Sequence, residues 1–436
     1  EVILKSYKEW GTECLKRFEG MFVFVIWDNK KNELIVARDR MGEKPLFYYY
    51  SRENGLIFAS EIKAFLAVKE FKEKLQLNEE SLNQYLSLNY LIDNQTFFKN
   101  IHTLEPASYL IVNKNNIKNI KSLKYWNLEN YFKNKTEDSY QTSIKKINEL
   151  IETSTRKRFF SNVTNGVFLS GGLDSGTLSY QLKNIENNNF DAHNIAFKEE
   201  DFDEYKDAKI ISDFFNANLF SYNIPIADQL VSEFPNIVEA MDQPMSDTSF
   251  IATYYLSKFS SKKSKMVLSG DGADELFCGY DTFIADKFRS YFPKIKSKLN
   301  LIPNILNYLF KSKVSKVGTN YKINKFINGV SHEKNHSHVL WREIFTLFEK
   351  KKIIKSYHDK YMNYNFLNYI DEQNKLVADL NYIDRYLYID LKTWLPNDIL
   401  YKIDRSTMFN SQEARVPFLD SKLVEYSSSL PVKSKL

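Results

Sequence analysis

Two short glycine-rich segments with acidic residues, each placed directly after an apolar run, most constrain what this chain can fold into. The first is Ser170–Ser175 (Ser-Gly-Gly-Leu-Asp-Ser), and the second is Ser269–Glu275 (Ser-Gly-Asp-Gly-Ala-Asp-Glu). Glycine lets the backbone approach a ligand closely, and a helix that begins after such a loop offers free N–H groups to phosphate. A strand, a glycine loop and a helix, found twice, predict an α/β fold with a ligand at the strand ends.

The segments around these loops alternate between short apolar runs and amphipathic helices. Helices are expected at 144–160, 176–185, 203–215, 227–241 and 250–259, with strands at 167–169, 194–197, 219–224 and 266–268. Strands separated by one or two helices pair in parallel, so residues 139–436 are predicted to form a doubly wound parallel sheet with helical additions. Beyond Asp281 the pattern is mostly helical.

The first part of the chain has a different pattern, with closely spaced strands and polar turns. Strands are expected at 21–28, 33–38, 46–50 and 56–59, followed by a short helix at 61–66 that Ser60 could cap. We therefore expect a layered sheet-and-helix domain over residues 1–115, and we expect this domain to be truncated at its N-terminus. Residues 116–138 are rich in Asn and Lys and are interpreted as a linker.

Composition narrows the classes of function. The 436 residues are 43% hydrophobic and 26% charged, which suits a globular protein of two or three domains. The net charge of +5 is spread over 60 basic and 55 acidic residues, which argues against a nucleic-acid-binding face. The exception is 287–325, with ten Lys or Arg and no acid, read as a solvated helical segment or as a surface for anionic lipid or an acidic partner. We find no apolar run of about 18 residues that would cross a membrane.

The glycine-rich loops also indicate a type of chemistry. The first loop lacks the lysine that reaches a γ-phosphate, so cleavage between the α and β phosphates is more natural. Asp174 is an unusual neighbour for phosphate unless a cation such as Mg²⁺ lies between them. Basic residues in 401–405 could steady the charge on departing pyrophosphate. The plainer alternatives are a turn without ligand, a solvated acidic loop and a surface helix.

Taken together, these segments resemble the asparagine synthetase family, the glutamine-dependent amidotransferases of the adenylating type. The resemblance covers nearly the whole chain. In the first part it is carried by 20–24, 37–42, 44–46 and 60–64, and in the second by 169–175, 242–247, 254–257, 269–275 and 413–420. It implies a partial N-terminal Ntn-hydrolase glutaminase of αββα layers and a C-terminal synthetase domain of the PP-loop ATP pyrophosphatase type.

The resemblance also implies a reaction and its residues. A carboxylate, aspartate in the type enzyme, attacks MgATP to form an acyl-adenylate, and ammonia derived from glutamine converts it to an amide. By this match Leu169, Phe197, Ser269 and Gly270 would border ATP, and Ser170, Gly171, Gly172 and Ser175 would hold its pyrophosphate. Asp174 and Asp274 would bind Mg²⁺, and Asp271 would lie near the adenylated substrate. The late basic residue is either Lys402 or Arg405.

The chain departs from the family pattern at its start. The family's nucleophile is an N-terminal cysteine, whereas this chain begins with Glu1 and its Cys14 is internal. We therefore expect a fragment without a glutaminase nucleophile, which uses free ammonia but not glutamine.

Other functions stay open at this stage. Relatives amidate uronic acids of surface polysaccharides or close β-lactam rings, a PP-loop enzyme acting on tRNA is a further class, and a non-catalytic relative is the last. Two cysteines without a CxxC pair indicate a reducing compartment, so a cytoplasmic location is expected. The family resemblance also allows a homodimer.

Overall fold

The structure is a computed structural model that describes residues 1–51, 55–160, 162–185, 189–198, 203–225, 227–290, 334–354 and 365–435. Nearly all of the basic segment 287–325 lies outside these residues. Among the described residues, no helix combines the length and apolar character that crossing a membrane requires.

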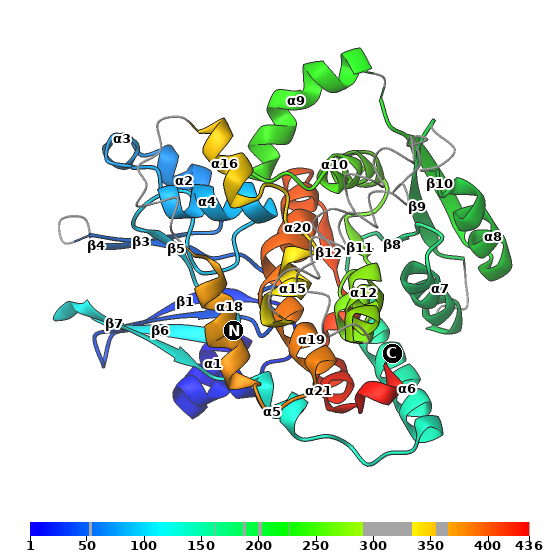
Figure 1. Cartoon of the computed structure of the whole chain (residues 1–436), viewed down its shortest axis with the longest axis horizontal. Coiled ribbons are helices and arrows are strands. Elements are labelled where there is room, and N and C mark those ends of the chain that lie inside the picture. The colour runs from blue at the N-terminus through cyan, green and yellow to red at the C-terminus, as the bar shows by residue number, and fades with distance from the viewer. Residues whose placement is uncertain are drawn as a thin grey trace.

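The N-terminal part, residues 1–124, contains two antiparallel sheets (Figure 1). The four-stranded sheet has the order β1-β2-β6-β7 and consists of Val23–Asp28, Glu33–Arg38, Ser108–Asn113 and Asn116–Lys124. The three-stranded sheet has the order β4-β3-β5 and consists of Gly55–Ala59, Phe47–Ser51 and Ile101–Thr103. The helices of this part are α1 (Val2–Trp10), η1 (Gly11–Lys16), α2 (Ile62–Leu66), α3 (Lys69–Lys72) and α4 (Glu79–Leu88).

Apolar side chains hold these elements in four layers. Val36 and Leu110 of the larger sheet pack with Leu46, Leu104 and side chains of β3 and β4, so the two sheets stack face to face. On the outer face of the larger sheet, α1 and η1 contribute a separate cluster around Leu15. The outer face of the smaller sheet packs on α2 and on helices of the C-terminal part. The predicted αββα arrangement is confirmed.

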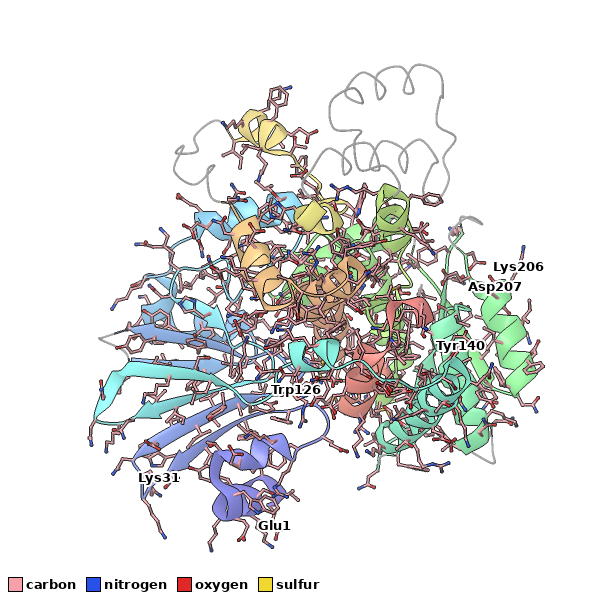
Figure 2. The ribbon with its side chains drawn as sticks, turned by 60° about the horizontal axis from the view of Figure 1, so that its bottom comes forward. Glu1, Lys31, Trp126, Tyr140, Lys206 and Asp207 are labelled. Carbon is pink, nitrogen blue, oxygen red and sulfur yellow. The ribbon has the colours of Figure 1, made fainter. Side chains whose placement is uncertain are left out.

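The segment 116–138 differs from the expected linker. Residues 116–124 form β7, which pairs with β6, and Glu129–Lys133 form the helix α5. Its many Asn and Lys residues obscured the strand, because β7 is an edge strand with a solvated face. Figure 2 shows Trp126 beyond this strand, where its indole N–H donates to Glu425 of the C-terminal part over 2.8 Å.

The C-terminal part, residues 139–435, is built on a five-stranded parallel sheet with the order β10-β9-β8-β11-β12. In that order the strands are Asn218–Asn223, Asp191–Ala196, Asn165–Phe168, Met266–Leu268 and Glu413–Arg415. Helices α6, α7 and α8 contact one another in sequence along the sheet, while α10 and α20 pack against each other and against β9, β10 and β12 (Figure 1). The predicted doubly wound parallel sheet is confirmed.

The helices of this part follow the expected alternation. They are α6 (Tyr140–Phe159), α7 (Leu173–Ile185), α8 (Tyr205–Phe215), α9 (Ala227–Met241), α10 (Ser249–Ser260), α11 (Ala273–Phe277), α12 (Asp281–Ser290), α15 (Lys334–Leu340), α16 (Leu347–Ile353), α18 (Leu367–Leu376), α19 (Tyr382–Lys392), α20 (Leu400–Phe409) and α21 (Ser421–Ser429). Shorter turns are the π-helical η3 (Leu395–Ile399) and the 3₁₀ turns η4 (Pro417–Leu419) and η5 (Val432–Ser434).

The strand order reverses direction at β8. The chain runs outward from β8 to β9 and β10, and then returns to place β11 on the other side of β8. The loops that leave β8 and β11 therefore lie side by side at the carboxyl edge of the sheet, where a doubly wound sheet usually binds its ligand. Both glycine-rich segments occupy this position.

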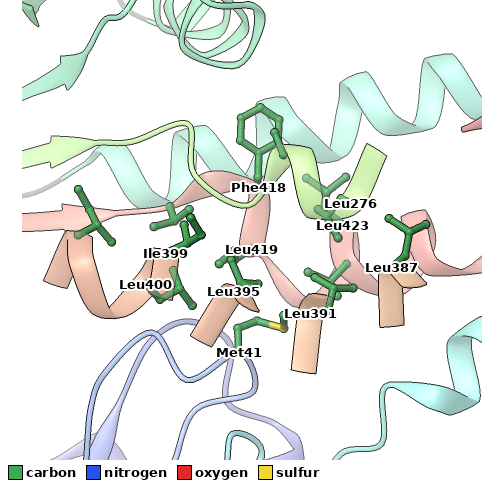
Figure 3. Close-up of a cluster of buried hydrophobic side chains, with 14 of the residues drawn as sticks. Met41, Leu276, Leu387, Leu391, Leu395, Ile399, Leu400, Phe418, Leu419 and Leu423 are labelled. Carbon is green, nitrogen blue, oxygen red and sulfur yellow. The ribbon is translucent and has the colours of Figure 1, made fainter. Parts of the chain in front are cut away.

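One apolar cluster joins the helices behind the sheet to the N-terminal part. Figure 3 shows Leu391, Leu395 and Leu419 meeting in this cluster, with Met41 from the N-terminal part inserted beside them. Met41 is 4% exposed, so a residue of the first sheet region completes the core of the second. The two parts consequently share one packed interior.

A buried histidine links three of the C-terminal helices. His338 of α15 lies between Asp286 of α12 (2.6 Å) and Asp390 of α19 (3.0 Å), and Arg342 binds Asp390 through both guanidinium nitrogens. Burial alone would lower the pKa of His338, but Asp390 and Asp286 outweigh it, so the pKa is raised. The protonated ring is thus the state that the fold selects.

This arrangement predicts a pH-dependent contribution to stability. His338→Gln should lower the free energy of unfolding by about 3 kcal/mol at pH 6, because it leaves a buried charge without its partner. Since the folded-state pKa is raised, the stabilisation is complete below about pH 6.5 and is lost as the pH rises through the folded-state pKa. Urea unfolding of the wild type and of His338→Gln, measured from pH 6 to 10, should show that the difference between their free energies of unfolding becomes smaller as the pH rises. His336→Gln is the control, because its partner Asp371 is exposed, and an equal loss at every pH would contradict the prediction.

Candidate active site

A cavity of about 300 Å³ lies at the carboxyl edge of the parallel sheet, between the loops that follow β8 and β11. Its polar lining comes from Ser170, Asp174, Ser175, Asn194, Glu204, Ser249, Thr253, Ser269, Asp271, Asp274, Glu275, Tyr280 and Lys402. Apolar lining comes from Phe168, Leu169, Ile195, Phe197, Leu256, Ile399 and Ile403. The cavity therefore has apolar surface for a ring system and an acidic wall with one lysine.

The loop after β8 is held by its own hydroxyl groups. The Ser170 amide donates to the Ser175 hydroxyl over 3.3 Å, and the Gly172 amide donates to the Ser170 hydroxyl over the same distance. Gly171 has φ +86°, and a Cβ there would lie 2.5 Å from Asp207 of α8, so only glycine fits. The loop thus presents two serines and the first turn of α7 to the cavity, an arrangement suited to anions.

The loop after β11 packs directly on the first loop. A Cβ on Gly270 would lie 3.1 Å from the Cβ of Asp174, which shows how closely the two loops approach. The Ser269 hydroxyl donates to Asp271 over 2.6 Å. A Cβ on Gly279 would lie 1.8 Å from the carboxylate of Asp274, so glycine at 279 makes room for this side chain.

The acidic side chains repel one another. Burial, together with Asp274 and Asp271, raises the pKa of Asp174 to about 6. Burial and Asp271 also raise the pKa of Asp274. A site that holds carboxylates against this cost is suited to a cation.

The carboxylates of Asp174 and Asp274 would suit a Mg²⁺ ion that a bound phosphate also contacts. In the described part of the chain, no group of three acidic, histidine or cysteine side chains is arranged to hold a metal ion alone. Asp174 and Asp274 would therefore supply part of the coordination and a phosphate group the rest, as is usual for Mg²⁺.

Lys402 is the cationic side chain among the described residues that line the cavity. Its ammonium donates to Asp247 over 2.9 Å and to the Ser249 hydroxyl over 2.8 Å. Burial alone would lower its pKa, but Asp247, Asp271 and Asp398 outweigh burial and raise it. Lys402 is thus a fixed positive charge in the cavity wall.

Arg405 lies one turn further along α20 and points away from the cavity. Its guanidinium donates to the Ser60 carbonyl over 2.6 Å and forms an ion pair with Glu61 at 3.0 Å. Both residues belong to the N-terminal part. Of the two basic candidates that the sequence left open, the structure brings Lys402 to the cavity and Arg405 to the boundary between the parts.

Glu275 is a buried acidic residue of the cavity lining. The Tyr280 hydroxyl donates to one of its carboxyl oxygens over 2.5 Å, and the other oxygen is buried without a hydrogen-bond partner among the described residues. Burial raises the pKa of Glu275 to about 8. A protonated carboxyl here could donate a hydrogen bond to a bound ligand.

Most of the site residues that the sequence predicted lie in this lining. The predicted residues in the lining are Leu169, Ser170, Asp174, Ser175, Phe197, Ser269, Gly270, Asp271, Asp274 and Lys402, and those outside it are Gly171, Gly172 and Arg405. Sequence reasoning gave no role to Asp247, Ser249, Glu275 or Tyr280. Asp247 and Glu275 lie within the segments 242–247 and 269–275 that carry the resemblance, whereas Ser249 and Tyr280 lie beyond them.

The protein is an α/β protein whose cavity lies at the switch point of a doubly wound sheet, the usual ligand position in such folds. Two family models match the chain, a glutamine amidotransferase domain at residues 1–126 and asparagine synthase at residues 146–436. The chain belongs to the asparagine synthase family, with an N-terminal glutamine amidotransferase domain.

Individual relatives agree at low identity. The chain is 28% identical to asparagine synthetase (glutamine-hydrolyzing) 1 of Bacillus subtilis, 28% identical to asparagine synthetase (glutamine-hydrolyzing) 3 of the same organism, and 26% identical to amidase chry2 of Gibberella zeae. Each match covers 100% of this chain and, in that order, 66%, 65% and 67% of the relative. The chain therefore spans about two thirds of the length of these relatives.

Repulsion among the acidic side chains of the cavity should lower the free energy of unfolding, and this effect can be measured. Asp274→Asn should raise the free energy of unfolding by about 0.5 kcal/mol without ligand, because it removes one of the crowded charges from a partly solvated site. Adding Mg²⁺ and ATP should raise the melting temperature of the wild type more than that of the variant. The exposed Asp379 serves as control, since Asp379→Asn should change neither quantity. A less stable apo variant would contradict the prediction.

Proposed function

We propose that the protein amidates aspartate to asparagine in an ATP-dependent reaction through a β-aspartyl-adenylate. The observation that supports this most is the convergence of an anion-binding loop, an acidic cation site and Lys402 on one cavity. A ligase of this kind needs all three, because it binds ATP and releases pyrophosphate.

The proposed steps assign a task to each group. A carboxylate oxygen of aspartate attacks the α-phosphorus of ATP, and the bond to the β-phosphate oxygen breaks. Ser170, Ser175 and the first turn of α7 hold the pyrophosphate, and Lys402 stabilises its negative charge. Mg²⁺ held by Asp174 and Asp274 would neutralise phosphate charge. Ammonia then attacks the acyl carbon, AMP leaves, and the ammonium proton passes to a base.

The acidic wall favours an acceptor with an amino group. Asp271 and Glu204 line the cavity, and a positively charged ammonium on the acceptor would be attracted to these carboxylates. Aspartate carries such a group, whereas a uronic acid carries none. Aspartate is therefore the preferred acceptor, and a uronic acid of a surface polysaccharide is the alternative that an assay must exclude.

The proposed nitrogen source is glutamine, hydrolysed by the amidotransferase domain of the whole protein. Cys14 does not serve as the nucleophile in this proposal, because it is 1% exposed and burial raises its thiol pKa. Both cysteines are free, which suits the reducing cytoplasm as the proposed place of action.

The test of this function supplies the chain with ATP, Mg²⁺ and an acceptor, together with either ammonium or glutamine. We expect AMP and asparagine with aspartate and ammonium, and no product with glucuronic acid. If product forms with the uronic acid and not with aspartate, the uronic acid is the acceptor and the proposal for aspartate is wrong. Glutamate release from glutamine by this chain would contradict the exclusion of Cys14.

The acidic pair should be required for the first half-reaction. Asp174→Asn and Asp274→Asn should each abolish ATP–pyrophosphate exchange, because each carboxylate would share the metal with the phosphates. Exchange of radiolabelled pyrophosphate into ATP measures this step without ammonia. Near-normal exchange in both variants, with Asp379→Asn as control, would overturn the assignment.

The two basic residues should differ in their effect. Lys402→Ala should lower the exchange rate about 100-fold, equivalent to about 3 kcal/mol of transition-state stabilisation. Arg405→Ala should cost less, because Arg405 does not line the cavity. If neither variant loses more than a few-fold, α20 does not contribute to the reaction.

A further inference from the structure

Two segments of the C-terminal part each face both the cavity and the N-terminal part. The first is the connection 241–249 between α9 and α10, and the second is the helix α20. At the cavity they supply Ser249 and Lys402, and Asp247 of the first segment pairs with Lys402 at 2.9 Å. On their other side they supply Asp242 and Arg405, which contact the start of α2. The same two segments thus form both a cavity wall and a domain junction.

Asp242 caps α2 across the junction. One carboxylate oxygen accepts the Ile62 amide at 2.6 Å and the other accepts the Lys63 amide at 2.8 Å. The first amides of a helix lack partners within the helix, and Glu61 at the N-cap position makes no side-chain cap. Sequence analysis expected Ser60 to cap this helix, but the structure supplies the cap from 180 residues away.

Arg405 fixes α20 to the same place. It is 3% exposed, and it contacts the Ser60 carbonyl and the Glu61 carboxylate just before α2 begins. Beside it, Asp404 pairs with Lys44 of the N-terminal part at 3.0 Å. Arg405 and Asp404 are themselves buried, so the loss of a partner would leave either charge unpaired in the interior.

We propose that Asp242 and Arg405 are positioning residues, which hold the connection 241–249 and α20 against α2 and thereby fix the Asp247–Lys402 pair in the cavity. The N-terminal part then sets the position of Lys402 without touching a substrate. The catalytic readout of this proposal rests on the proposed function, whereas its structural readout does not.

The structural readout is hydrogen exchange at the amides of Ile62 and Lys63. Lys402→Ala removes the pairing of Asp247 and should loosen the connection that carries Asp242, so these two amides should exchange at least several-fold faster. Lys350→Ala is the matched control, because Lys350 is also buried and binds Asn83 and Ser87 of the N-terminal part at 2.7 Å, but from α16. Unchanged exchange in Lys402→Ala, or equal acceleration in both variants, would overturn the proposal.

The catalytic readout is a double-mutant cycle measured by ATP–pyrophosphate exchange. Asp242→Asn should lower kcat about 10-fold with little change in the KM for ATP, and should cause no further loss in the Lys402→Ala background. Arg405→Lys should retain more activity than Arg405→Ala, because it can still donate to the Ser60 carbonyl. Additive losses from Asp242→Asn and Lys402→Ala would overturn the proposal.

A second contact between the two parts serves as a control that distinguishes the positioning of Lys402 from a general disturbance of the boundary. Glu43 and Arg158 form a buried ion pair between the two parts, with 2.9 Å between one pair of atoms, but Arg158 belongs to α6 and not to α20. Glu43→Gln should therefore combine additively with Lys402→Ala, and a non-additive result would assign the effect to the whole boundary. If the wild type shows no exchange activity, the proposed function fails, and hydrogen exchange alone decides the positioning role.

Discussion

The reversal of strand order at β8 is the constraint on which the rest of the structure depends. Parallel strands require crossovers over the sheet, and the return from β10 to β11 places consecutive glycine-rich loops on either side of one crevice. Neither loop could form the cavity alone. Gly171 is needed because a side chain there would collide with α8, and Gly270 allows the close approach of the two loops.

The side chains that line the cavity carry more negative than positive charge. Asp174, Asp271 and Asp274 face it from two loops, and Lys402 is already paired with Asp247. Folding energy elsewhere, including the shared core around Met41, must offset this repulsion. A ligand that brings positive charge would relieve this repulsion, which is consistent with the proposal of ATP bound together with Mg²⁺.

Local patterns in the sequence predicted most of the described strands but not β5, β6, β7 or β12, and they predicted the junction poorly. The strands 33–38 and 266–268 and the helix 227–241 have the bounds that their apolar spacing indicated. The strand 116–124 was missed because its polar composition resembles a linker. Lys402 and Arg405 could not be separated, because their positions on one helix are a single turn apart and only tertiary contacts decide which side chain reaches the cavity.

The junction at α2 contacts main-chain groups of the N-terminal part. Asp242 accepts from the main-chain amides of residues 62 and 63, and Arg405 donates to the main-chain carbonyl of residue 60. Main-chain groups are present whatever the side chain, so this recognition tolerates sequence drift at those three positions. A chimaeric enzyme that keeps Asp242 and Arg405 in its synthetase part could therefore take a different amidotransferase part, with the boundary placed between 125 and 138 so that α2 and α20 stay intact.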